Sequence, residues 1–144
     1  MSSLGIIFPD QLSENNLVYE HLKAEDDLLL YEPIETFYKH NHHKQKLVFL
    51  LASLRNLKEP LSSRFNVIHE KIKPKQTTYI ASYLKELFLK KDYEEIFVTK
   101  PGDYETLSEL MFFAQSHGKL LHILEDTKFI SNVDDFKSWC KRYA

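Results

Sequence analysis

Three histidines gather in the stretch KHNHHKQK, at residues 39–46. If this stretch were helical, His40 and His43 would share a face, and two imidazoles on one face can hold zinc. Zinc sites usually have four ligands, but the chain has one cysteine, Cys140, and no HExxH or CxxC motif. The polar opening of an amphipathic helix would look the same, so we expect His40, His42 and His43 to bind no structural metal.

Carboxylates follow two strand-like segments. The first segment ends in FPDQLS, residues 8–13, where Asp10 could accept hydrogen bonds from a ribityl or ribose hydroxyl or a ring N–H, or could cap the turn. The second segment reads LLLYEPIETFY and places Glu32 and Glu35 near the same edge. Two carboxylates can form an acid–base pair. No nucleophile or metal motif accompanies them, so catalysis is the weaker interpretation.

The turn at residues 8–13 also limits the cofactor. It stands where a dinucleotide-binding fold carries GxGxxG, yet it contains no glycine, and no GxxxxGKS/T motif occurs elsewhere. Without such glycines the backbone cannot easily approach a pyrophosphate. We therefore expect no ordinary NAD or ATP site.

Apolar residues follow two kinds of spacing along the chain. Five nearly continuous runs are typical of parallel strands covered on both faces; they span residues 4–8, 27–32, 65–70, 95–100 and 119–125. Stripes at helical spacing, which we expect to face the core, occur at 17–22, 47–57, 80–88, 107–114 and 133–140. Gly118 suits the left-handed position after a helix, and SNVD at 131–134 predicts a capping box.

This alternation predicts an α/β fold. We expect a Rossmann-like open parallel sheet of five strands in the order 3-2-1-4-5, with helices on both faces. The length of 144 residues fits one domain, residues 1–144. Ligands in such sheets bind at the carboxyl ends of the strands, where the order reverses. The candidate loops are therefore 9–13, 31–38, 70–77 and 100–104.

Charge and composition exclude several classes of protein. With 19 Lys plus Arg against 21 Asp plus Glu, the net charge of -2 gives no general attraction to nucleic acid or anionic membrane. One cysteine excludes an internal disulfide, and the first residues lack the pattern of a signal peptide, so we expect a cytoplasmic protein. The longest apolar run, 47–52, is far shorter than the roughly 20 residues of a membrane helix. We expect no membrane contact.

Four segments together resemble the N-terminal domain of the photolyase-related proteins, a branch of the cryptochrome/photolyase superfamily that includes iron–sulfur bacterial (6-4) photolyases. They are FPDQLS at 8–13, YEPIETFYKHNHHKQKLVFLLASLRNL at 31–57, KPGDYETLSEL at 100–110 and FISNVDDFKSWC at 129–140. Each is weak alone, but their order and spacing are specific. The resemblance covers nearly the whole chain, and it implies that HHKQK opens a helix and binds no zinc.

The resemblance also implies an antenna-chromophore module of a DNA-repair flavoprotein family. In full-length relatives this domain carries 6,7-dimethyl-8-ribityllumazine, while FAD and a 4Fe–4S cluster occupy a larger helical domain downstream. A single cysteine cannot hold a four-cysteine cluster. The chain alone is therefore expected to be non-catalytic, to work with a helical FAD domain in cis or in trans, and to meet DNA only through a full-length protein.

A site can be carried over from the resemblance residue by residue. It comprises Asp10 with Gln11, Tyr31 with Glu32, Leu50, and a glutamate in the loop after the second strand. That glutamate aligns with Thr36, and Glu35 stands one residue before it. 

Two alternatives to an antenna domain stay open at this stage. One is an interaction or regulatory α/β module with an empty pocket. The other is a small enzyme of another α/β family that uses Asp10, Glu32 and Glu35.

Overall fold

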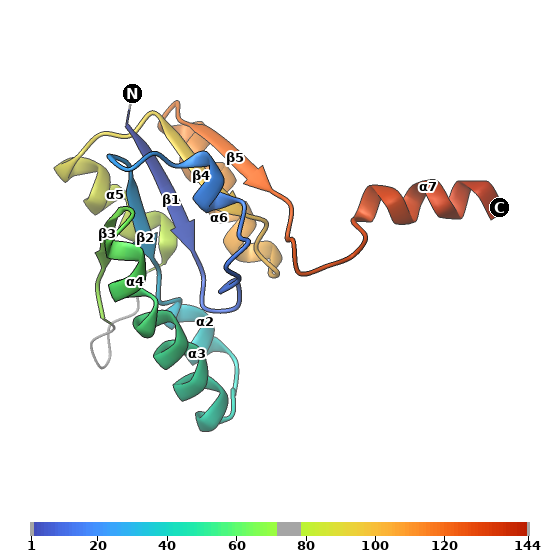
Figure 1. Ribbon diagram of the computed structural model, residues 1–144, viewed down its shortest axis with the longest axis horizontal. Helices are drawn as coiled ribbons and strands as arrows, with labels where there is room; N and C mark the ends of the chain where they lie inside the picture. The colour runs from blue at the N-terminus through green and yellow to red at the C-terminus, as the bar shows by residue number, and fades with distance from the viewer. Residues whose placement is uncertain (1, 72–78, 144) are drawn as a thin grey trace.

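The computed structural model describes residues 2–71 and 79–143, which form one open five-stranded sheet with surrounding helices (Figure 1). All neighbouring strands run parallel, in the order β3-β2-β1-β4-β5. The predicted fold class and strand order are confirmed. The strands are β1 (Ser3–Ile7), β2 (Asp27–Leu30), β3 (Asn66–His69), β4 (Glu95–Thr99) and β5 (Leu120–Leu124).

Helices cover both faces of the sheet, as predicted. The helix α1 packs on β1 and β4, and α4 packs on β3, whereas α5 and α6 pack together and α6 contacts β5. Within the described ranges, no helix combines the length and apolar character needed to cross a bilayer. The helices are α1 (Val18–His21), α2 (Ile34–Lys39), α3 (Lys44–Asn56), α4 (Lys58–Ser62), α5 (Ile80–Lys90), α6 (Tyr104–Ser116) and α7 (Val133–Tyr143).

The central strand β1 is buried along its whole length and contributes to a hydrophobic core on each side of the sheet. Leu4 and Ile6 join a core that includes Leu84 of α5 and Phe113 of α6. Ile7 joins the other core, which includes residues of α1 and α4. Because successive side chains of a strand point to opposite faces, burial on both sides explains why the strand segments are continuously apolar.

Gly5 allows α1 to approach β1 closely. A Cβ atom at this position would lie 2.5 Å from Cδ1 of Leu22 and 2.7 Å from Cγ1 of Val18, well inside van der Waals contact. A side chain at residue 5 would therefore point at α1. We term this side of the sheet the α1 face.

Two short helices differ from expectation. Residues 34–38 of the predicted loop 31–38 belong to α2, whose first residue Ile34 is buried. Residues 58–62 form α4, where Leu61 is buried against the sheet. Each of these helices has one or two turns and a single buried residue, so the sequence contains no repeated apolar spacing from which the helix could be predicted. The left-handed cap at Gly118 is confirmed, with a φ of 62°.

The last helix also departs from the prediction. Val133, Phe136 and Trp139 were expected to face the core, but all three are exposed, and α7 stands apart from the sheet (Figure 1). Its capping box lies one residue later than predicted. The Asp135 N–H donates to Asn132 Oδ1 at 2.8 Å, and the Asn132 N–H donates to Asp135 Oδ2 at 3.2 Å.

Candidate ligand-binding site

A cavity of about 290 Å³ opens at the carboxyl edge of the sheet, where the strand order reverses between β1 and β4. We term it the switch-point cavity. Its walls come from the segments that follow β1, β2 and β4, together with α3. The apolar lining is Phe8, Pro9, Pro33, Phe37, Leu50 and Pro101, and the polar lining is Asp10, Thr36, His42, Lys46, Asp103 and Thr106, with Gly102 beside them.

Three residues of the predicted site line this cavity: Asp10, Thr36 and Leu50. Asp10 is exposed at the rim, and its Oδ2 would lie 3.8 Å from a Cβ atom at Gly102. Its carboxylate therefore faces the turn after β4 across the point of strand reversal. Tyr31 does not line the cavity, but its ring packs edge-on against Phe8, which does, with 5.8 Å between centroids.

Gln11 holds one wall of the switch-point cavity in place without lining it. Its buried side chain donates from Nε2 to the carbonyl oxygens of Thr99 and Lys100, at 3.1 Å each. Asn16 donates from Nδ2 to the carbonyl oxygen of Gln11 at 3.0 Å and accepts from the Thr99 hydroxyl at 2.8 Å. These bonds tie the turn at 8–13 to the end of β4.

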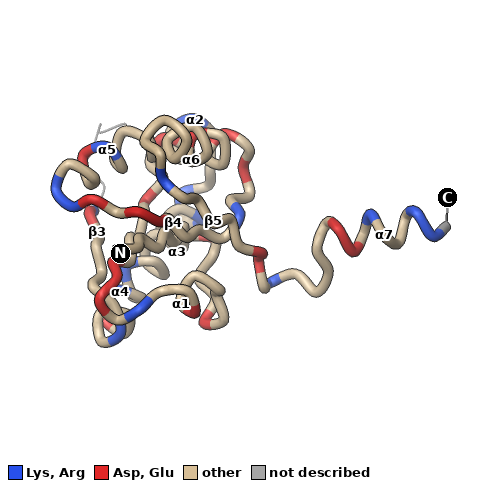
Figure 2. The backbone as a smooth tube through the Cα atoms, turned by 90° about the horizontal axis from the view of Figure 1, so that it is seen from above, with Lys and Arg blue, Asp and Glu red and all other residues tan. Residues whose placement is uncertain are grey.

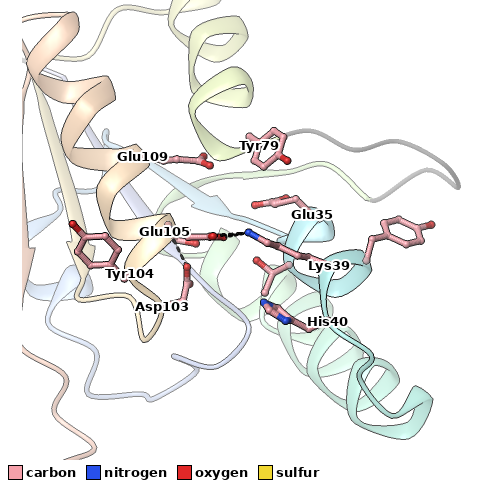
Figure 3. A pocket seen from close by; sticks show the side chains of 11 residues that line it. Glu35, Lys39, His40, Tyr79, Asp103, Tyr104, Glu105 and Glu109 are labelled. Carbon is pink, nitrogen blue, oxygen red and sulfur yellow. Dashed lines mark hydrogen bonds and ion pairs between the residues drawn. The ribbon is translucent and has the colours of Figure 1, made fainter.

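A second cavity, of about 500 Å³, lies beside the first and is bordered by α2, Tyr79 and the first turns of α6 (Figure 3). The two cavities share Thr36, Asp103 and Thr106. Lys39 of α2 pairs with a carboxylate of α6 across this space, and Asp103 caps α6 by accepting the Thr106 N–H at 2.7 Å. We term it the acidic cavity because its lining includes Glu35, Asp103, Glu105 and Glu109.

Glu35 lines the acidic cavity and not the switch-point cavity. The Tyr31 hydroxyl lies 3.2 Å from each of its carboxylate oxygens and donates to them. Burial, reinforced by the charges of Glu109 and Asp103, raises the pKa of Glu35 to about 7, although the bond from Tyr31 favours the ionised form. Glu35 therefore changes its protonation near neutral pH, one cavity away from the place where the aligned glutamate would act.

Glu35→Gln should stabilise the protein at pH 8 by about 1–3 kcal/mol and have little effect at pH 4.5. Because the pKa of Glu35 is raised in the folded state, its contribution to the free energy of unfolding is complete below about 4.5 and is lost as pH rises through about 7. A neutral glutamine removes that loss. Urea unfolding across this pH range measures it, with the exposed Glu20→Gln as control. An unchanged pH profile in Glu35→Gln would contradict the assignment.

Glu32 belongs to the scaffold. Its buried carboxylate accepts from Arg55 Nε at 2.7 Å and from Nη2 at 2.8 Å, and its Oε1 lies 2.9 Å from Nε2 of His69. The carboxylate thus joins the end of β2 to α3 and to the end of β3, and it lines neither cavity. Asp10, Glu32 and Glu35 lie in three different environments. They therefore do not form the acid–base pair that the small-enzyme hypothesis requires.

The three histidines of residues 39–46 occupy three different positions. His43 is the N-cap of α3, where its Nδ1 accepts the Gln45 N–H at 3.3 Å. His40 ends α2 and borders the acidic cavity, whereas His42 lines the switch-point cavity. Across residues 2–71 and 79–143, no group of three or more His, Cys, Asp or Glu side chains is arranged to hold a metal ion.

The sequence prediction missed several wall residues of the switch-point cavity. Phe37 was missed because α2 was expected to be a loop. Lys46 could have been found, because a helix that starts after His43 puts Lys46 and Leu50, four residues apart, on one face. Of the candidate loop 70–77, residues 72–77 lie outside the described residues.

An open parallel sheet with a cavity at its strand reversal defines a doubly wound α/β domain of the kind that binds small molecules at this edge. The sequence matches the family of the deoxyribodipyrimidine photo-lyase-related proteins over residues 5–144, and the chain belongs to this family. It is also similar to the (6-4) photolyase of Agrobacterium fabrum, with 28% identity over 142 residues and 96% of this chain. The chain spans only 28% of the length of that photolyase.

Proposed function

We propose that this chain is a non-catalytic, antenna-type domain that binds a lumazine-like ring in the switch-point cavity. The observation that carries the proposal is the convergence of Asp10, Thr36 and Leu50 on one largely apolar cavity at the strand reversal. The three residues come from segments far apart in the sequence. Membership of the photolyase-related family supports the proposal, because the resemblance to these proteins implies antenna contacts at the same three positions.

The lining of the cavity suits 6,7-dimethyl-8-ribityllumazine. A flat ring needs apolar walls, which Phe8, Phe37 and Leu50 provide together with three prolines. Ring N–H groups and ribityl hydroxyls need a few placed acceptors, and the carboxylates of Asp10 and Asp103 can supply them. The volume of about 290 Å³ lies at the lower end of the usual range for small-molecule sites. When bound, such a lumazine absorbs light and passes the excitation to a flavin; the residues of this chain hold and orient it.

The proposal leaves the redox chemistry to a partner. FAD and a 4Fe–4S cluster would belong to a helical domain that works with this one in cis or in trans. Acidic and basic residues are interspersed along the chain (Figure 2), and the net charge is -2, so we expect DNA contact only through a full-length protein. Light-dependent repair of DNA is accordingly assigned to a full-length protein, and this chain alone is expected to show none.

Thr36→Glu should tighten the binding of 6,7-dimethyl-8-ribityllumazine by about 10-fold. Thr36 lines the switch-point cavity at the position that aligns with the glutamate of the family, whereas Glu35 faces the acidic cavity. A carboxylate at residue 36 would offer the ligand a charged acceptor. Fluorescence titration of wild type and variant measures the change, with Thr36→Gln as the neutral control of the same length.

Saturable binding by wild type that tightens in Thr36→Glu but not in Thr36→Gln supports the antenna proposal. No binding by either wild type or Thr36→Glu, up to the solubility of the ligand, would favour the interaction module with an empty pocket. Equal binding by all three proteins would place the ligand away from residue 36.

A further inference from the structure

The outer strand β5 is incompletely covered on the α1 face of the sheet. The strand register sets Gly5, Phe97 and His122 side by side on this face, so Leu120 and Leu124, two residues either side of His122, point the same way. Leu120 is 61% exposed, and His122 keeps 40% of its side chain exposed although its ring stacks on Phe97 at 4.5 Å. All-parallel sheets are normally covered on both faces. Leu124, at the carboxyl end of the strand, packs partly against the core on this face, so the uncovered strip of β5 is Leu120 and His122.

The helices already described do not provide that cover. On the α1 face, α1 lies over β1 and β4. The helix that contacts β5 is α6, and it does so from the opposite face, where Leu110 and Phe113 share a core with Leu121. Each of the helices α1 to α6 has at least one buried residue, whereas none is found in α7 within the part of the chain that the structure describes.

The helix α7 presents an apolar face to solvent. Val133 and Phe136 are more than half exposed, and at helical spacing they fall on one side together with Cys140, opposite Ser138. Two views at right angles show α7 extending away from the sheet (Figures 1 and 2). Eleven residues are too few for a helix to be stable alone in water, so a helix of this length depends on packing its apolar face.

We propose that α7 folds back over the uncovered strip of β5, beside α1, within the same chain. The two surfaces match in length: an 11-residue helix and a five-residue strand are both about 16 Å long. Each surface also exposes apolar side chains in the extended arrangement: Leu120 on β5, and Val133 and Phe136 on α7. Closure would add α7 to the cover of the α1 face.

The segment between β5 and α7 is held on the α1 face of the sheet by two hydrogen bonds. The Thr127 hydroxyl donates to the carbonyl oxygen of Asn15 at 3.0 Å, and Lys128 Nζ donates to the carbonyl oxygen of Asp10. The turn from residue 10 to residue 15 leads directly into α1, so these bonds hold residues 127–128 at the carboxyl edge of the α1 face. Residues 129–132 lie between this anchor and α7 and would act as the hinge.

The same strip could be covered by α7 of a second copy, in a reciprocal exchange. Closure within one chain makes the same contacts without the loss of translational and rotational freedom that association costs. We therefore assign the contact to a single chain and make the exchanged dimer an outcome of the test.

The first experiment uses Trp139, which is the only tryptophan of the chain and is 57% exposed in the extended arrangement. In the wild-type chain its fluorescence should be blue-shifted and protected from iodide. Phe136→Asp places a charge in the apolar face and should shift the ratio of closed to open chains by about 10- to 100-fold towards open, which exposes Trp139. Ser138→Asp introduces the same residue on the opposite side and should behave as wild type.

The second experiment uses Cys140, the only cysteine. A helix that starts at the carboxyl edge of β5 and runs back along it brings Cys140 towards Leu120. Leu120→Cys should therefore form a disulfide with Cys140 within one chain on mild oxidation, since such a bond requires Cα atoms within about 7 Å. Phe112→Cys is the control, because Phe112 is also an exposed apolar residue, at 70% against 61% for Leu120, and lies on α6, across the sheet.

A protected Trp139 in wild type, lost in Phe136→Asp alone, together with a monomeric disulfide in Leu120→Cys alone, supports closure. Three results would each overturn it: the same solvent-exposed emission in wild type and Phe136→Asp, no disulfide in Leu120→Cys, or disulfide-linked dimers in place of monomers. The last result would assign the strip to a second copy.

Discussion

Asp27→Asn is expected to lower the free energy of unfolding by about 2–4 kcal/mol at pH 7. Asp27 opens β2, and its carboxylate is 2% exposed. It accepts from Asn66 Nδ2 at 2.6 Å, from Lys91 Nζ at 2.9 Å and from the Tyr93 hydroxyl. Asparagine would turn a donor towards one of these donors and remove the charge that faces Lys91. Because Lys91 is 42% exposed and can turn to water, we expect the cost to stay within this range.

The same hydrogen bonds to Asp27 make the free energy of unfolding depend on pH in the acidic range. Burial alone would raise the pKa of Asp27, but the bonds from Tyr93, Lys91 and Asn66 together outweigh burial and hold the pKa below its ordinary value of 3.8. A lowered carboxyl pKa stabilises the folded state above about 3.8, and this contribution is lost as pH falls further. Asp27→Asn should therefore show a weaker loss of stability in acid than wild type does.

Urea unfolding at pH 7 and at pH 3 measures both effects. Asp92→Asn is the matched control, because Asp92 also pairs with a lysine, Lys119, but its side chain is 75% exposed. Exposed pairs contribute little, so this control should change stability by less than about 1 kcal/mol. Equal effects of the two variants would mean that burial of Asp27 does not strengthen its interactions.

The strands could be predicted because burial on both faces leaves a signal in every residue of a segment. In β1, Leu4, Ile6 and Ile7 must all be apolar, since two of them face one core and the third faces the other. Helices between such runs then require crossover connections between parallel strands, which restricts the topology to a few arrangements that include the observed strand order. The apolar runs of single segments were therefore enough to predict the order of strands in the sheet.

The apolar stripe of α7 was predicted to face the core, and this prediction is wrong for the structure, in which the stripe is exposed. Periodicity records which side chains avoid water, but it does not identify the surface that they meet. The stripes of α5 and α6 meet the sheet, with Leu84 and Leu110 fully buried, whereas Val133 and Phe136 are exposed. Composition cannot separate these cases, because the difference lies in the path of residues 125–132.

The assignment of Glu35 and Thr36 could not be made from sequence for a related reason. With residues 34–39 taken as a loop, both side chains could have reached one ligand. On a helix, consecutive residues point about 100° apart. In α2 this separation sends Glu35 into the acidic cavity with Tyr31, while Thr36 borders both cavities. The helix, not the sequence alignment, decides which of the two side chains borders the switch-point cavity.

Asp10→Ala should weaken the binding of 6,7-dimethyl-8-ribityllumazine by about 5- to 150-fold. A buried ring ligand depends on a few placed polar groups, and a ligand donor left without an acceptor costs about 1–3 kcal/mol. The structure offers a clean substitution, because the carbonyl oxygen of Asp10 that accepts from Lys128 is retained in alanine. The change therefore removes the carboxylate at the cavity rim while the chain path can stay the same.

Fluorescence titration of wild type, Asp10→Ala and Asp10→Asn should give a graded loss, because asparagine keeps one acceptor oxygen and loses the charge. Glu14→Ala is the matched control: Glu14 is an exposed carboxylate close to the same turn, and it lines neither cavity. Its removal should leave the dissociation constant unchanged. If wild type binds tightly and Asp10→Ala binds equally well, the ligand lies outside the switch-point cavity. If Glu14→Ala weakens binding as much as Asp10→Ala does, the carboxylates act through the general field of the turn and not through contact with the ligand.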